Sequence, residues 1–145
     1  MLLMPKAISI MPFTRVESFD SDDRLDGIAL LLRPINLLGD PVNIVGDVRS
    51  ELFDYRQASG DPKGNRVAMW NVSIRTEQDQ LKHWSSTTQT YEFRLAFETS
   101  VVPKHGKYVL EVTYNTPLGT HLTDEYILEL PVARESSAIS QGGQT

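Results

Sequence analysis

The sequence predicts an all-β protein, a single antiparallel β-sandwich of about seven strands with one short helical segment near residues 77–84. Three observations predict this fold. Apolar and polar residues alternate along most of the chain with a period of two, which is the spacing of a half-buried strand. Clusters of Gly, Pro, Asn and Asp separate the alternating runs. Helical periodicity is nearly confined to one segment, and 145 residues with 40% hydrophobic content suit one core.

The alternating runs give the expected strands. The clearest run places four large apolar side chains on one face, namely Tyr91, Phe93, Leu95 and Phe97. Trp70 alternates in phase with Val72 and Ile74, so we expect it to face the core. The continuous apolar run Ile28–Leu32 predicts a central strand covered on both faces. The same alternation predicts a strand at 108–116, and weaker or interrupted patterns predict the other strands, at 7–13, 45–55 and 120–130.

Turn chemistry lies between these runs. Leu38–Pro41, Ser59–Asn65 and Thr116–Gly119 combine Pro, which presets φ, with Gly, which tolerates positive φ. The last of these turns is short, and it therefore predicts a hairpin between the two final strands.

One segment departs from the strand pattern. Thr76 is a suitable N-cap, and Asp79 follows three residues later, as in a capping box. The spacing predicts one or two helical turns over 77–84, lying over the edge of the sandwich. Leu81 and Trp84 are three residues apart, so we expect both to face the core.

The organisation expected from composition is one sandwich domain over residues 1–133 and a flexible C-terminal tail over 134–145. The tail lacks large apolar residues and is rich in Ser, Gly and Gln, so it cannot offset the entropy of ordering its backbone. The first residues do not have the pattern of a secretory signal peptide. No apolar run approaches the roughly 20 residues of a membrane span.

Charge and cysteine content exclude several classes of function. The net charge of −5 predicts no nucleic-acid partner, because phosphate binding requires a basic surface. The absence of cysteine excludes disulfides, thiolate nucleophiles, iron–sulfur clusters and cysteine-based zinc sites.

Two groups of residues are candidates for metal binding. Asp20, Asp22, Asp23 and Asp26 supply carboxylates of the kind that Ca²⁺ prefers, although they do not fit an EF-hand loop. A solvated loop rich in turn-forming residues is the simpler interpretation. His83, His105 and His121 have no metal-ligand spacing, so only the fold can bring them together. We therefore expect no cofactor, with Ca²⁺ as the weaker alternative.

A ligand site is suggested by aromatic and basic residues in the connecting segments. Trp84 stands at the end of the helical segment, beside His83 and before a polar stretch, where an exposed indole stacks on a sugar ring or anchors a protein. Lys63 lies in the loop Gly60–Gly64, which lacks the residues of a phosphate-binding loop. Packing of Trp84 on the sheet edge is the alternative interpretation.

The run Gly106–Tyr114 resembles the penultimate strand of immunoglobulin-like and fibronectin-III-like sandwiches of bacteria, and Tyr108 then resembles the corner tyrosine of those domains. A longer similarity runs from about Pro12 to Leu130. It includes Leu37–Val42, Asp61–Gly64 and Thr116–Gly119, and it is shared with an uncharacterised group of planctomycete-type envelope proteins regarded as lipoproteins. The resemblance implies an immunoglobulin-like fold and a location in the bacterial envelope or periplasm.

Together these observations predict a non-catalytic binding or structural module that contacts a protein partner or a second copy of itself. Such a module is expected to have an apolar surface patch or an unpaired edge strand without charged residues. One alternative is carbohydrate or small-ligand binding near Trp84. The other, a metal-dependent enzyme, requires the histidines or the aspartates to converge.

Overall fold

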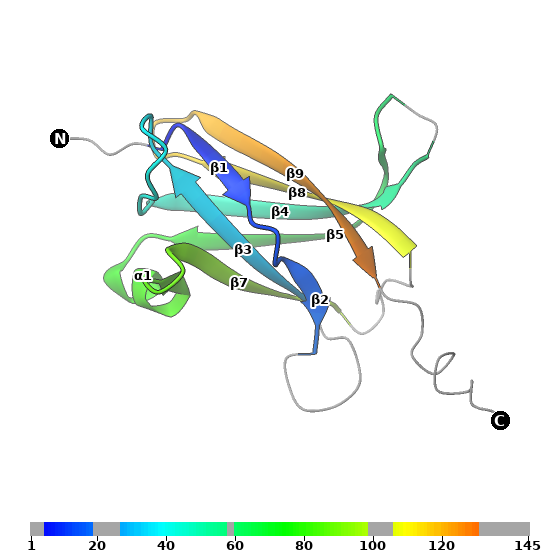
Figure 1. Cartoon of the computed structure of the whole chain (residues 1–145), viewed down its shortest axis with the longest axis horizontal. Coiled ribbons are helices and arrows are strands. Elements are labelled where there is room, and N and C mark those ends of the chain that lie inside the picture. Colours follow the sequence, from blue (N-terminus) through cyan, green and yellow to red (C-terminus); the bar gives the residue numbers. More distant parts are fainter. Residues whose placement is uncertain (1–4, 19–26, 58–59, 99–105, 131–145) are drawn as a thin grey trace.

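The computed structural model describes residues 5–18, 27–57, 60–98 and 106–130 and contains two packed, antiparallel sheets (Figure 1). The first sheet has the order β1–β3–β7–β6, with β2 also paired to β3. Its strands are β1 (Ala7–Ile10), β2 (Arg15–Glu17), β3 (Gly27–Ile35), β6 (Trp84–Ser85) and β7 (Thr90–Ala96). The second sheet has the order β5–β4–β8–β9. Its strands are β4 (Gly46–Tyr55), β5 (Lys63–Ile74), β8 (Gly106–Asn115) and β9 (His121–Leu130).

The predicted all-β sandwich is confirmed. Nine strands are present in the described residues where about seven were expected, and the two smallest, β2 and β6, have only three and two residues. The predicted hairpin is also confirmed, because β8 pairs with β9 from Gly106↔Leu130 to Asn115↔His121. The predicted tail over 134–145 lies outside the described residues.

The core forms where alternate side chains of the two sheets meet. Its fully buried members include Leu30 of β3, Phe93 of β7, Leu52 of β4 and Leu110 of β8, each no more than 1% exposed. Burial of one such side chain stabilises the fold by about 1.5–3 kcal/mol. The period of two therefore identified core-facing positions of β7 and β8.

Two expectations about burial were wrong in part. The outer-facing residues of the Ile28–Leu32 run, Ala29 and Leu31, are only half-buried, so β3 is central in its sheet but covered fully on one face. Trp70 faces the core as expected, but it is half-buried because β5 is the last strand of its sheet.

The predicted helical segment is α1 (Glu77–His83). Thr76 Oγ1 accepts a hydrogen bond from the backbone N–H of Asp79, and the Asp79 carboxylate accepts one in return from the N–H of Thr76, which completes a capping box. The expectation that Leu81 faces the core was wrong, since its side chain is 76% exposed. Three-residue spacing puts two side chains near one face, but on a helix this short the flanking strands decide which face is buried.

A buried polar network holds α1 against the segment that crosses from β3 to β4. The hydroxyl of Tyr91, a fully buried residue, accepts a hydrogen bond from Ile44 N at 2.9 Å and donates one to Gln80 Oε1 at 2.6 Å. Gln80 Nε2 donates in turn to Ile44 O at 2.7 Å. Because each of these buried groups is satisfied, the network fixes the position of α1 at one end of the sandwich.

Candidate functional site

The three residues predicted to form a ligand site are not brought together. Lys63 begins β5, whereas His83 and Trp84 lie beyond the other end of that strand. A twelve-residue strand spans about 36 Å. A single small ligand therefore does not contact Lys63 and Trp84 at once.

Lys63 belongs to an ion-pair network on the outer face of the second sheet. Its Nζ lies 3.1 Å from Glu111 Oε2 and 3.2 Å from Glu125 Oε2, and it lies 5.4 Å from the centre of the Phe53 ring. Glu51, Glu111 and Glu125 are direct cross-strand neighbours, an arrangement that is unfavourable without cations. The hydrogen bond to Glu111 is the main cause that raises the pKa of Lys63 above its usual value. The positive charge of Lys63 thus serves to offset the repulsion between these neighbouring glutamates.

Trp84 is half-buried and packs edge-on against Tyr91, with ring centroids 4.9 Å apart. It nevertheless lines a hollow of about 550 Å³ together with Asn43, Gln80, Leu81 and Ser86. The exposed side chain of Leu81 forms part of the same hollow. The predicted position near Trp84 is therefore concave and aromatic, with amide groups beside it.

His83 does not line the hollow beside Trp84. Its Nδ1 donates a hydrogen bond to the carbonyl oxygen of Glu92 at 3.1 Å, and its ring packs against Phe93 with centroids 4.9 Å apart. The histidine therefore occupies the outer edge of β7, where it covers a backbone acceptor that no strand pairs with.

The candidate metal residues are mostly outside the described part of the chain. Asp20, Asp22, Asp23, Asp26 and His105 all fall there. His83 and His121 lie on α1 and at the start of β9. Within the described ranges, no group of three or more His, Asp or Glu side chains is placed to hold a metal ion.

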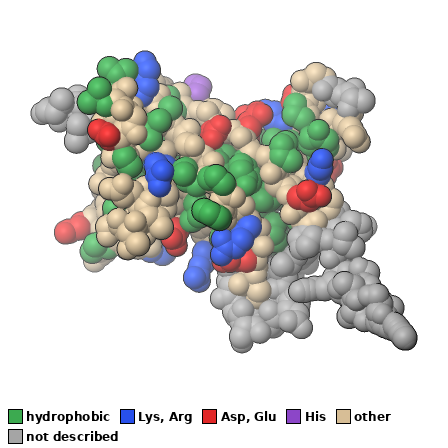
Figure 2. Space-filling view, viewed as in Figure 1, with side chains coloured by type: hydrophobic (Ala, Val, Ile, Leu, Met, Phe, Trp, Pro, Cys, Tyr) green, Lys and Arg blue, Asp and Glu red, His purple; other side chains and the backbone are tan. Residues whose placement is uncertain are grey.

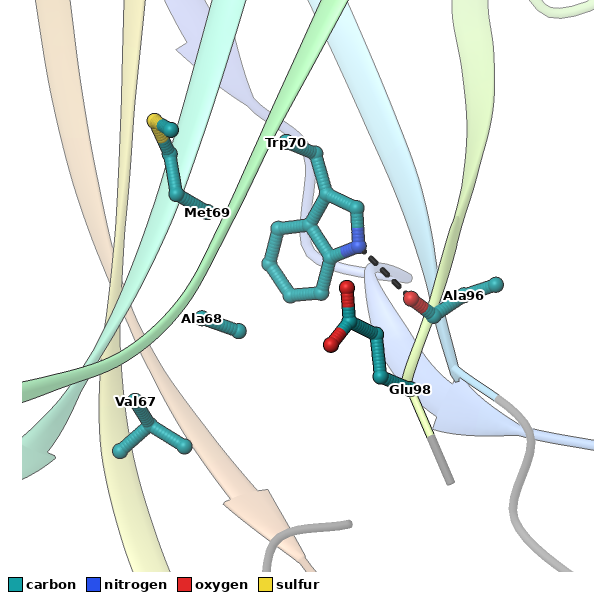
Figure 3. A pocket seen from close by; sticks show the side chains of 6 residues that line it. All are labelled: Val67, Ala68, Met69, Trp70, Ala96 and Glu98. Carbon is teal, nitrogen blue, oxygen red and sulfur yellow. Dashed lines mark hydrogen bonds between the residues drawn. The ribbon is translucent and has the colours of Figure 1, made fainter. Parts of the chain in front are cut away.

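The second half of β7 is an edge that side chains cover. β6 pairs only with Thr90 and Tyr91, so the strand from Glu92 onward has no neighbour among the described strands on this side. His83 Nδ1 donates a hydrogen bond to the carbonyl of Glu92. Trp70 Nε1 donates one to the carbonyl of Ala96 at 2.8 Å (Figure 3). Two side chains from outside the strand thereby occupy acceptors that an added strand would need.

The outer edge of β9 is also occupied. The segment containing β1 lies along it, and Asp124 Oδ2 accepts a hydrogen bond from Ile10 N at 2.8 Å. The Tyr126 hydroxyl donates to the carbonyl of Pro12 at 2.8 Å. Asp124, which interrupts the apolar pattern of the last predicted strand, thus satisfies a backbone donor of the other sheet.

The outer edge of β5 differs from both. The eight residues Val67–Ile74 contain no charged residue and no Pro or Gly, and they form the last strand of the second sheet. Their pairing with β4 is regular from Gly46↔Ile74 to Leu52↔Ala68, and the register shifts lie beyond it. Across the described residues, no hydrogen bond reaches this edge from a strand, loop or side chain. A long, regular, uncharged edge of this kind pairs readily with another chain.

Two hollows follow this edge. The first, of about 210 Å³, is lined by β5 residues and by Ala96 and Glu98, with the Trp70 indole at its side (Figure 3). The second, of about 720 Å³, lies beside Asn71–Ser73 and is lined by His83 and by charged side chains of α1 and β7, namely Asp79, Lys82, Glu92 and Arg94. Side chains of a strand added to β5 would therefore meet the smaller hollow beside Trp70 first and the larger, charged one further along.

Other parts of the described surface carry charged side chains of both signs. On the face shown in Figure 2, acidic and basic side chains are interspersed, and hydrophobic side chains lie among them. The ion pairs of the described residues join such neighbours, as in Arg75–Asp47 at 2.9 Å and Arg66–Glu51 at 3.0 Å. The uncharged stretch of β5 stands out against this background.

Residues missed by the sequence interpretation are those of the β5 edge. The uncharged run Val67–Ile74 is visible in the sequence, and Trp70 was assigned only to the core. The run gains significance because β5 is terminal in its sheet, and strand order is set by the tertiary fold.

None of the helices in the described residues has the length and apolar character needed to cross a membrane. Comparison of the chain with protein-family models, with curated proteins and with solved structures gives no match.

Proposed function

We propose that the protein is a non-catalytic binding module that accepts an extended segment of polypeptide as an added strand on β5. The observation that carries this proposal is the unpaired, uncharged edge Val67–Ile74. An edge strand presents a row of backbone donors and acceptors at the spacing of a β-ladder, so it binds an extended chain regardless of side-chain detail.

The neighbouring edges support the proposal by contrast. Where a strand end is left open on β7, Trp70 and His83 cover its carbonyls, and where β9 ends its sheet, Asp124 and Tyr126 reach across to a neighbouring segment. The hollows of about 210 and 720 Å³ beside β5 supply the side-chain specificity that main-chain pairing lacks.

The proposal includes an immunoglobulin-like character and a location in the bacterial envelope. The order β5–β4–β8–β9 opposite β1–β3–β7 supports the first part, since the chain changes sheet after β3, β5 and β7, as in Greek-key sandwiches. The second part rests on the resemblance to envelope proteins. In such a setting a rigid sandwich would hold another envelope protein by one strand.

The test is binding of a labelled peptide with the sequence of residues 66–75, an extended strand former, measured by fluorescence anisotropy at low protein concentration. The variant Met69→Lys/Asn71→Lys places two charges on the outer face of β5 and should weaken binding at least tenfold. The control variant Thr113→Lys/Thr123→Lys adds the same charge to the same face on β8 and β9 and should bind like the wild type. Absence of saturable binding, or equal loss in both variants, would contradict the proposal.

A second candidate function is recognition of a carbohydrate at the Trp84 hollow. The specific observation is that Trp84 lines a concavity of about 550 Å³ with Asn43, Gln80, Leu81 and Ser86. An aromatic face next to amide and hydroxyl groups suits a sugar, which has one apolar face and a rim of hydroxyls.

This second candidate is tested by titrating neutral oligosaccharides while the indole N–H signals of Trp70 and Trp84 are followed by NMR. Binding at the hollow should shift the Trp84 signal and leave the Trp70 signal in place. The variant Ser86→Tyr, which fills the hollow, should abolish the shift. No change at Trp84 with any sugar would remove this candidate.

A further inference from the structure

We infer that the strand accepted by β5 is β5 of a second copy of this chain, paired antiparallel across a two-fold axis. This inference rests on the proposed function and names the partner. A two-fold interface requires one patch to be complementary to itself. The edge Val67–Ile74 meets that requirement, because it is free of charge along its whole length and therefore does not repel an identical strand.

The charges that flank the edge are already neutralised within each copy. Arg66 precedes the uncharged run and is paired with Glu51 at 3.0 Å, and Arg75 follows it and is paired with both carboxylate oxygens of Asp47 at 2.9 Å. A second copy therefore approaches a stretch bounded by compensated arginines at both ends. A strongly charged strand would find no opposite charge along this edge, so an uncharged strand is the better partner.

The geometry of the sheet restricts the register of such a pair. Directly opposite residues of an antiparallel pair point to the same face of the sheet. Met69, Asn71 and Ser73 are exposed on the outer face, while Trp70 and Val72 face the core. A two-fold pair must therefore be centred on a residue rather than between two residues. The centres that keep the uncharged runs overlapped are Trp70 and Asn71.

Both registers pair uncharged residues along the regular part of the strand, Ala68–Ile74. With Trp70 opposite itself, Met69 lies opposite Asn71 of the other copy and Ala68 lies opposite Val72. With Asn71 opposite itself, Met69 lies opposite Ser73 and Ala68 lies opposite Ile74. In each case the two four-stranded second sheets join into one continuous sheet. The hollow beside Trp70 is then covered by the partner copy.

The first experiment is sedimentation equilibrium of the whole chain over a concentration series. We expect a reversible monomer–dimer equilibrium, weakened about tenfold or more by Asn71→Lys, because both registers bring the two added charges close together. The control Thr113→Lys, with the same charge on the central strand β8, should dimerise like the wild type.

The second experiment uses the absence of cysteine in the chain, which makes any introduced thiol unique. Asn71→Cys alone should form an interchain disulfide under mild oxidation if Asn71 is the centre. An equimolar mixture of Met69→Cys and Asn71→Cys should form the mixed dimer if Trp70 is the centre. Thr113→Cys serves as the control and should form no interchain disulfide.

A monomer at every concentration, with no disulfide beyond the control, would overturn the dimer. If the 66–75 peptide still bound such a monomer, the proposed function would stand and the partner would be a different polypeptide. Amides of 67–74 that resist hydrogen exchange at every dilution in a monomer would show the edge to be covered by the chain itself. That outcome would overturn both the dimer and the proposed function.

Discussion

The outer edges of β5 and β7 lie on the same side of the sandwich, yet the protein treats them differently. The open part of β7 is short, and Trp70 and His83 hydrogen-bond its outward carbonyls. The open part of β5 has eight uncharged residues, seven of them (Ala68–Ile74) in regular register with β4, and no such partner among the described residues. The two side chains that could cap a nearby edge, Trp70 of β5 and His83 of α1, both donate to carbonyls of β7.

The side-chain caps protect the edge of β7 from pairing with another strand, whereas the edge of β5 remains open to pairing. Trp70 belongs to β5, but its indole N–H donates a hydrogen bond to the carbonyl of Ala96 at the end of β7 (Figure 3). The first residues of β5 are themselves secured, since Lys63 and Arg66 make ion pairs with glutamates of β4, β8 and β9. Among the described residues, neither a side-chain cap nor an ion pair covers the outer edge of Val67–Ile74. The following changes probe this contrast, beginning with the largest expected effect.

Removal of the Trp70 seal should be the most damaging change. Trp70→Ala deletes a half-buried indole that packs on Phe97 and donates a hydrogen bond to the carbonyl of Ala96, so we expect a loss of about 2–3 kcal/mol in the free energy of unfolding. Urea denaturation measures it. Met69→Ala, at the adjacent position and 40% exposed, should change stability by less than about 0.5 kcal/mol. Equal effects of the two variants would show that Trp70 does not seal the edge.

Removal of the histidine cap should have a smaller effect. His83→Ala loses the hydrogen bond to Glu92 O and the contact with the Phe93 ring, which together are worth about 1–1.5 kcal/mol. Hydrogen exchange should also accelerate along the second half of β7. Lys82→Ala, the neighbouring residue on α1, is the control and should leave both measurements unchanged. A β7 that exchanges equally fast in both variants would contradict the role assigned to His83.

Weakening of α1 should also weaken the hydrogen bond from His83 to Glu92, because His83 is the last residue of this helix. Thr76→Ala removes the N-cap and should cost about 1 kcal/mol. Hydrogen bonds from the N–H groups of Arg75 and Thr76 hold the pKa of Asp79 below its usual 3.8. The support from this carboxylate is therefore present above that value and is lost as the pH falls through the lower pKa of the folded state. Acid titration of the helical circular dichroism signal checks this, and Asp79→Asn should remove the acid dependence.

The smallest expected effect concerns the secured start of β5. The pKa of Lys63 is raised by its bond to Glu111, so its contribution to stability is present below 10.5 and is lost as the pH rises through the higher pKa of the folded state. Thermal unfolding between pH 9 and 12 should show a slight additional fall that Lys63→Met lacks. A Lys63→Met curve parallel to that of the wild type across this range would contradict the assignment.

Much of the fold was predictable because local rules were sufficient for it. The period of two identified the core positions of β7 and β8, and the Thr76–Asp79 pair identified the start of α1. The turn with Gly119, whose φ is 91°, identified the final hairpin.

The site was less predictable because its properties depend on strand order and on distant partners. Nothing local indicates that β5 ends its sheet, that Lys63 pairs with residues 48 and 62 positions away, or that Asp124 accepts a bond from Ile10. Leu81 was misplaced for the same reason, since the Tyr91–Gln80–Ile44 network fixes which face of α1 is turned inward.

The most direct measurement is amide hydrogen exchange along Val67–Ile74, read at single residues by NMR, in dilute protein and again at high concentration or with the 66–75 peptide. We predict that alternate amides of this strand exchange rapidly in dilute protein and become protected when a second strand is supplied. Slow exchange of every amide at all dilutions, or rapid exchange that neither the peptide nor concentration alters, would contradict it.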